Sequence, residues 1–172
     1  MSTLRETLIE EMADVYDAEK QIVKALPKMA KAARHEELRD AFETHLQETE
    51  RQVERLEEAF EMLGEKPRAK KCKAMQGLIK EGEDMIKEDE GDAALICAAQ
   101  KIEHYEIATY GSLASWARLL EEEDAADLLE ETLDEEKSTD EKLTQVAESA
   151  INIEESEEEE EETKQHAKGR NK

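Results

Sequence analysis

The chain has 172 residues, of which 41% are charged and only 3% aromatic, and its formal net charge at pH 7 is -23. An acidic surface of this kind repels nucleic acid and anionic lipid, so neither is an expected partner. No run approaches the roughly 18 apolar residues of a membrane span, and the first residues lack the apolar core of a signal peptide, so we expect a cytoplasmic protein.

The composition favours helices and a single domain. Gly and Pro total 6 and 2, which leaves few positions for hairpin turns, whereas the helix-forming residues Ala, Glu, Lys and Leu are abundant. The two cysteines, Cys72 and Cys97, fit neither a metal-site spacing nor a disulfide framework, as is typical of a reducing cytosol.

The first predicted helix begins at the capping residue Ser2 or Thr3 and ends around residues 33–35. Pro27 predicts a kink or a short break near residues 21–23, because proline removes a helical hydrogen bond. Apolar side chains recur at helical spacing, with one carboxylate among them. These core positions are Leu8, Met12, Val15, Glu19, Ile22, Leu26 and Met29.

The second predicted helix runs from about Glu37 to Leu63, and Gly64 closes it as a C-cap. A polar row, which lies beside its core positions, contains His45, Glu48 and Gln52. The core positions themselves are Phe42, Leu46, Thr49, Val53, Leu56, Phe60 and Leu63.

A connection of roughly 28 residues, from Gly64 to Gly91, separates this pair of helices from a second pair and contains a short amphipathic helix at about 74–87. The second pair is predicted at about 92–121 and 124–151. The long connection favours an all-α, ferritin-like four-helix bundle with a crossover between its second and third long helices. We expect the bundle to span residues 1–153, and the Glu-rich segment 154–172 to be an acidic disordered tail.

A carboxylate interrupts the apolar pattern near the midpoint of each long helix. In the third helix Glu106 occupies a core position with Glu103 three residues before it, and in the fourth Glu136 and Asp140 lie four residues apart. Helix midpoints lie at about the same height in an up-down bundle, so these side chains should meet Glu19 and Glu48 in the interior. Buried carboxylates repel one another strongly unless a cation lies between them.

Two metal ions would resolve this repulsion. Carboxylates chelate hard cations, and the di-metal bundles combine Glu residues with Glu-x-x-His pairs on facing helices. In this sequence His45 precedes Glu48 by three residues and supplies a nitrogen ligand. The predicted metal ligands are Glu19, His45, Glu48, Glu103, Glu106, Glu136 and Asp140.

Four motifs resemble those of the YciE/YciF family of ferritin-like bacterial stress proteins. They are Tyr16-Asp17-Ala18-Glu19-Lys20-Gln21, His45-Leu46-Gln47-Glu48-Thr49, Glu103-His104-Tyr105-Glu106-Ile107-Ala108 and Thr132-Leu133-Asp134-Glu135-Glu136-Lys137. The resemblance extends to about Ile151. It implies a ferritin-like bundle, a homodimer, a rubrerythrin-like centre with two iron ions, and a role in the stress response.

The sequence departs from the rubrerythrin pattern on the nitrogen side of the site. The third residue after Glu48 is Arg51, and the third after Glu136 is Thr139, where the pattern has histidine. His45, Gln52 and Asp140 would then substitute, or an oxygen-rich site would favour manganese or a mixed-metal centre.

Two functional hypotheses follow. The first is a protein that binds iron or another metal and either reacts with dioxygen or peroxide or sequesters iron under stress, with electrons supplied from elsewhere because a four-cysteine rubredoxin domain is absent. The second is a metal-free acidic helical scaffold or interaction protein, in which the interior carboxylates are protonated or hydrated.

Overall fold

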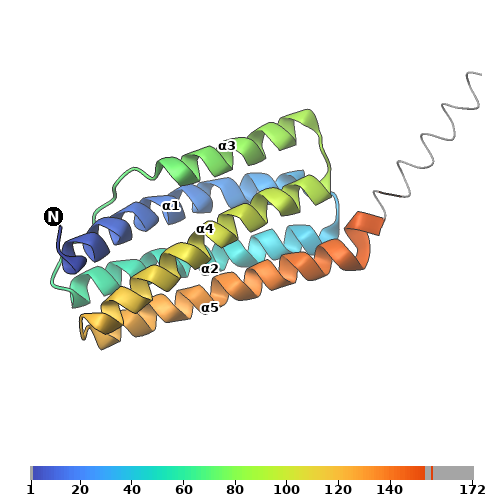
Figure 1. The fold of residues 1–172 in the computed structure, drawn as a ribbon. Helices are drawn as coiled ribbons and strands as arrows, with labels where there is room; N and C mark the ends of the chain where they lie inside the picture. Colours follow the sequence, from blue (N-terminus) through green and yellow to red (C-terminus); the bar gives the residue numbers. More distant parts are fainter. Residues whose placement is uncertain (1, 154–155, 157–172) are drawn as a thin grey trace, which may run out of the picture.

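The computed structural model describes residues 2–153 and residue 156, and these form helices without any strand. The predicted ferritin-like four-helix bundle with a long crossover is confirmed (Figure 1). In chain order the helices are α1 (Leu4–Ala32), α2 (Glu36–Met62), α3 (Lys73–Glu88), α4 (Asp92–Leu119) and α5 (Glu123–Val146), followed by the π-helical turn η1 (Ala147–Ile151).

The four long helices enclose one core. Helix α1 packs against α2 and α4, and α5 packs against the same two helices from the opposite corner. The short crossover helix α3 lies outside this square, along α1 and α4 (Figure 1). None of the described helices has the length and the apolar composition that a membrane span needs.

Helix α1 begins as predicted but is not broken by its proline. Thr3 and Glu6 form the reciprocal hydrogen bonds of a capping box. The predicted interruption near residues 21–23 is wrong, because α1 runs through Pro27 to Ala32. Pro27 is exposed, and Val23, whose carbonyl group would lose its helical partner, is only half-buried.

Two buried or half-buried aspartates attach the connecting segments to the bundle. Asp17 on α1 accepts hydrogen bonds from the backbone N–H of Cys72, at 2.9 Å, and from the side chain of Gln21. Asp92, at the start of α4, is 4% exposed and accepts from the backbone N–H groups of Arg34 and His35. These contacts join the crossover and the α1–α2 turn to the bundle.

The buried face of α2 is rotated relative to the prediction. His45 and Gln52, which were expected beside the core, are buried, whereas Leu46 and Val53 are only half-buried. The cause is that α2 packs against both α1 and α5, so its buried surface is wider than a single row. The rotation turns His45 inward.

The end of the chain differs in part from the prediction. Helix α5 stops at Val146 and the backbone continues as η1, so the predicted helix to residue 151 is α-helical only to Val146. The predicted acidic tail falls, apart from Ser156, on residues outside those that the structure describes.

Candidate metal centre

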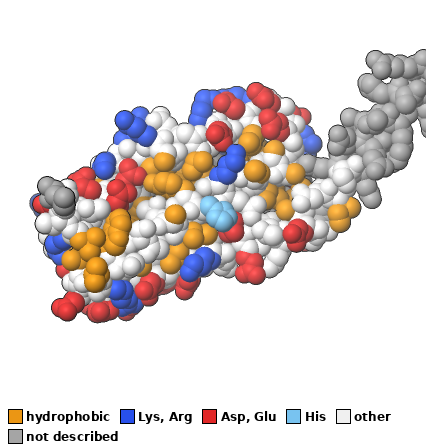
Figure 2. All heavy atoms as spheres, viewed as in Figure 1, with side chains coloured by type: hydrophobic (Ala, Val, Ile, Leu, Met, Phe, Trp, Pro, Cys, Tyr) orange, Lys and Arg blue, Asp and Glu red, His pale blue; other side chains and the backbone are white. Residues whose placement is uncertain are grey.

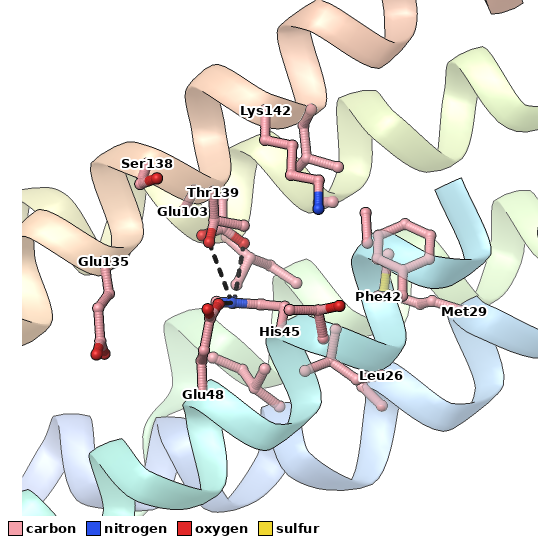
Figure 3. Close-up of a pocket in the computed structure, with 17 residues that line it drawn as sticks. Leu26, Met29, Phe42, His45, Glu48, Glu103, Glu135, Ser138, Thr139 and Lys142 are labelled. Carbon is pink, nitrogen blue, oxygen red and sulfur yellow. Dashed lines mark hydrogen bonds and ion pairs between the residues drawn. The ribbon is translucent and has the colours of Figure 1, made fainter. Parts of the chain in front are cut away.

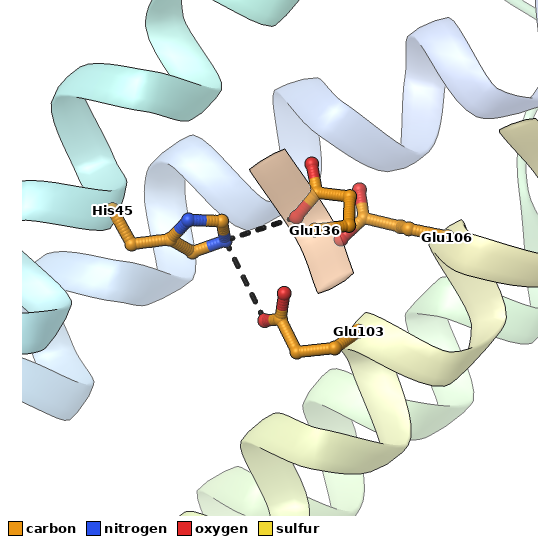
Figure 4. A group of neighbouring side chains, drawn as sticks. All are labelled: His45, Glu103, Glu106 and Glu136. Carbon is orange, nitrogen blue, oxygen red and sulfur yellow. Dashed lines mark ion pairs between the residues drawn. The ribbon is translucent and has the colours of Figure 1, made fainter. Parts of the chain in front are cut away.

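Four buried side chains from three helices converge in the middle of the bundle (Figure 4). Each offers one ligand atom, and these atoms all lie within 4.8 Å of one another. His45 comes from α2, Glu103 and Glu106 from successive turns of α4, and Glu136 from α5. We call this set the His-Glu cluster.

The imidazole of His45 lies between the carboxyl groups of the cluster on one side and Glu48 and Thr139 on the other. Its Nε2 atom is 3.5 Å from Oε1 of Glu103 and 3.6 Å from Oε2 of Glu136. Its Nδ1 atom is 3.4 Å from Oε2 of Glu48 and 3.3 Å from the hydroxyl of Thr139. The half-buried Glu48 therefore holds the ring from the side that faces away from the cluster.

Glu19 on α1 extends the cluster towards the fourth long helix. Its side chain is fully buried, and Tyr110 on α4 donates a hydrogen bond to its Oε1 atom. Glu19 also interacts with the carboxyl group of Glu106. All four long helices therefore contribute to one polar interior.

Most of the inward-facing atoms have no hydrogen-bond partner. Such groups are rare in protein interiors, because each costs about 1–3 kcal/mol when it is left unpaired. The unpaired atoms are Oε2 of Glu19, Nε2 of His45, Oε2 of Glu103, and both carboxyl oxygens of Glu106 and of Glu136.

Burial controls the protonation of the carboxyl groups. It raises the pKa of Glu103, Glu106 and Glu136, and it raises the pKa of Glu19 to about 8. The neighbouring carboxylates raise the pKa of Glu19 and Glu106 further, because ionising one of these groups would place its negative charge beside another.

His45 is the cation of the metal-free interior. Burial alone would lower the pKa of its imidazole, but Glu103 and the other nearby carboxylates raise the pKa to about 10. The protonated ring in turn lowers the pKa of Glu48. A cation was expected at this height of the bundle, and in the described residues an imidazolium supplies it.

The cluster fits a metal ion. Carboxylate oxygen and imidazole nitrogen are the donors that iron, manganese and zinc accept in proteins, and four of them lie within reach of one point. A bound divalent cation would replace the protons of these groups and satisfy the unpaired atoms. The buried cluster could therefore hold a metal ion.

Comparison with known proteins places the chain in a family. A family model described as "Domain of unknown function (DUF892)" matches residues 3–156. The chain belongs to this family. It is also 48% identical over 157 residues to Protein YciF of Escherichia coli, with 88% of this chain and 95% of YciF covered. The resemblance to the YciE/YciF family is thus confirmed.

Solved structures agree with this assignment. The crystal structure of the E. coli stress protein YciF has a TM-score of 0.83 at 49% identity and covers 86% of this chain and 96% of its own. YcfI of Rhodopseudomonas palustris has a TM-score of 0.81 at 42% identity, covering 83% and 94%. A protein of Xanthomonas campestris has a TM-score of 0.73 at 26% identity, covering 92% and 99%.

The structure of this DUF892 protein sorts the seven predicted ligands into three groups. His45, Glu103, Glu106 and Glu136 form the cluster. Glu19 contacts Glu106 and Glu48 contacts His45, whereas Asp140 lies apart, where it accepts a 3.0 Å hydrogen bond from the amide of Gln100.

Some supporting residues were not predicted as such. Gln52, a predicted substitute ligand, donates a hydrogen bond to Glu135, which also pairs with Arg55. Arg55 is largely buried in the α2–α5 interface and donates to Thr132 as well. In the sequence, an arginine at this position is typical of a helix surface. Only the carboxylates that gather on α5 could have indicated the network.

Proposed function

We propose that this protein binds redox-active metal, most simply iron, in the His-Glu cluster and reacts with dioxygen or peroxide or sequesters the metal under stress. The main support for this proposal is the set of unpaired buried atoms. Without partners these atoms lower the free energy of unfolding, and a bound cation would remove that loss. Bound iron or manganese would supply the electron exchange with the oxidant.

Each residue has a defined task in this proposal. Nε2 of His45 and the carboxylates of Glu103, Glu106 and Glu136 hold the ion. Glu48 orients the imidazole through Nδ1, a contact that typically strengthens metal binding by histidine. Loading the site releases the proton of His45 and those of the carboxyl groups.

A second ion and a second subunit extend the proposal. Glu19 adds a carboxylate beside Glu106, which supports a two-metal centre.

The homodimer implied by the family resemblance is supported by exposed apolar side chains: Leu119 is 74% exposed, and apolar side chains gather along the face seen in Figure 2.

Metal titration tests the function. Purified protein is treated with chelator, loaded anaerobically with Fe²⁺ or Mn²⁺, and analysed for bound metal, with the absorption spectrum recorded after exposure to air. We expect stoichiometric metal, thermal stabilisation and new near-ultraviolet absorption with iron. No bound metal and no stabilisation would favour the metal-free scaffold.

Matched variants locate the site. The double variant Glu106→Gln, Glu136→Gln preserves side-chain shape and should lose metal binding, whereas the exposed Glu141→Gln should retain it. Asp140→Asn should also retain metal, because Asp140 lies outside the cluster. Two metal equivalents in the double variant would refute the site.

A further inference from the structure

A cavity of about 130 Å³ lies next to the His-Glu cluster, between α1, α2, α4 and α5 (Figure 3). Its inner walls are buried and mainly apolar, and they are formed by Ile22, Leu26, Met29, Phe42, Ile102 and Leu143. Its rim is polar and lies at the gap between α2 and α5, with Thr44, Glu48, Ser138, Thr139 and Lys142.

One side of the cavity is polar although it is buried. His45 and Glu103 line it and are only 3% and 2% exposed. Nε2 of His45 and Oε2 of Glu103 have no hydrogen-bond partner. The cavity therefore joins an apolar chamber to two unsatisfied polar groups, an arrangement that suits a ligand with one apolar and one polar part.

Size and charge narrow the class of ligand. An apolar cavity of roughly 150 Å³ accommodates a benzene ring, so this chamber fits a single ring or a short branched chain. The rim carries Glu48 and Glu135 against the single cation Lys142, and Glu103 lies beside His45 in the inner wall, so with a net charge of -23 the surroundings disfavour an anion. The apolar walls disfavour an organic cation, because its charge would lose its hydration.

We propose that the cavity binds a small neutral molecule with an apolar body no larger than about one six-membered ring and a single hydroxyl or hydroperoxyl group. The O–H group hydrogen-bonds to Glu103 or His45, and the body lies against Leu26, Phe42 and Leu143. Binding to the metal-free protein needs only these contacts. That the molecule meets the metal, as an organic peroxide would, rests on the proposed function.

Phenol and toluene test the inference on the metal-free protein. The two have similar size and differ in the hydroxyl group. Calorimetric titration in chelator should give phenol a Kd on the order of 0.1–1 mM and toluene an affinity roughly fivefold weaker, the worth of about one hydrogen bond. Equal or tighter binding of toluene, or no saturable binding of phenol, would overturn the inference.

Variants place the ligand in the cavity. Ala99→Leu and Ala41→Leu each fill the chamber from a different wall, whereas Ala108→Leu adds the same bulk on the exposed side of α4. In whichever cavity variant keeps its helical circular dichroism, phenol affinity should fall at least tenfold, with Ala108→Leu unchanged. Unchanged affinity in a folded cavity variant would contradict the site.

Two further measurements complete the test. If tert-butyl hydroperoxide displaces phenol at lower concentration than tert-butanol does, the cavity prefers a ligand with a hydroperoxyl group. If tert-butanol displaces phenol at the lower concentration, the cavity prefers a ligand with a hydroxyl group. Metal uptake is measured separately. Phenol binding without metal uptake would defeat the proposed function and leave the cavity site standing, whereas metal uptake without phenol binding would defeat the cavity site alone.

Discussion

Tyr110 on α4 donates a hydrogen bond to Glu19 on α1, and neither side chain is exposed to solvent. The contact crosses between the two helical hairpins. It satisfies one oxygen of a carboxyl group whose other oxygen has no partner. The phenol thus holds Glu19 in place beside Glu106 in the metal-free protein.

Removing this hydrogen bond should destabilise the metal-free protein. Tyr110→Phe leaves Oε1 of Glu19 unpaired and should lower the free energy of unfolding by about 1–3 kcal/mol, measured by urea denaturation in chelator. Tyr16→Phe is the control, because its partner Glu57 is only half-buried and can turn to water. An equal loss in both variants would show that burial of the acceptor does not matter.

Stability of the metal-free protein should fall as pH rises. Burial raises the pKa of Glu19 from 4.5 to about 8. Between these pH values the carboxyl group is ionised in the unfolded chain but protonated in the folded one, so the free energy of unfolding falls progressively as pH rises. His45 acts in the same sense: its pKa rises from 6.5 to about 10, so its contribution is complete below pH 6.5 and is lost towards pH 10.

Urea denaturation at pH 5 and pH 9 in chelator measures this dependence. Each group contributes at most about 1.4 kcal/mol per pH unit within its own range. Glu19→Gln should reduce the dependence between pH 5 and 8, and the remaining dependence belongs to His45 and the other buried carboxyl groups. Added metal should stabilise more as pH rises, because its ligands must lose protons. Constant stability from pH 5 to 9 would contradict these protonation states.

An apolar replacement in the cluster should separate stability from metal binding. Glu106 is buried and neither of its carboxyl oxygens has a hydrogen-bond partner. Glu106→Met should therefore raise the free energy of unfolding of the metal-free protein by about 1–3 kcal/mol. The same variant should lose stabilisation by iron or manganese. Thermal melts with chelator and with metal measure both effects, and a destabilised metal-free variant would mean that the contact of Glu106 with Glu19 outweighs the cost of burying its carboxyl group.

The aspartate at the start of α4 should be a main determinant of stability. Asp92→Ala removes the acceptor for the backbone N–H groups of Arg34 and His35 and should cost about 2–3 kcal/mol. Asp89→Asn, which removes the charge of an exposed ion pair with Arg34 and keeps a side chain that tolerates the left-handed backbone at φ 56°, should cost less than about 1 kcal/mol. Chemical denaturation of the two variants compares a buried acceptor with an exposed one.

The helices were predictable because each has a continuous amphipathic pattern and recognisable ends. Thr3 starts α1 and Gly91 precedes α4, as the sequence indicates. The meeting of Glu106 and Glu136 followed from their mid-helix positions. The rotation of each helix about its axis did not follow, because it depends on packing against two neighbours. That rotation turns His45 inward, and Asp140 contacts Gln100 instead of the cluster.

The residues of the His-Glu cluster come from α2, α4 and α5, so the cluster is complete only after the last long helix has been synthesised. A nascent chain that has reached the end of α4 contains His45, Glu103 and Glu106 but lacks Glu136, which belongs to the last long helix. If the proposed function holds, metal is captured only by a completed bundle. Chains made when metal is scarce keep unpaired polar atoms in their interior and open more readily to proteases. The cellular amount of the protein would then follow the supply of metal without any dedicated regulator.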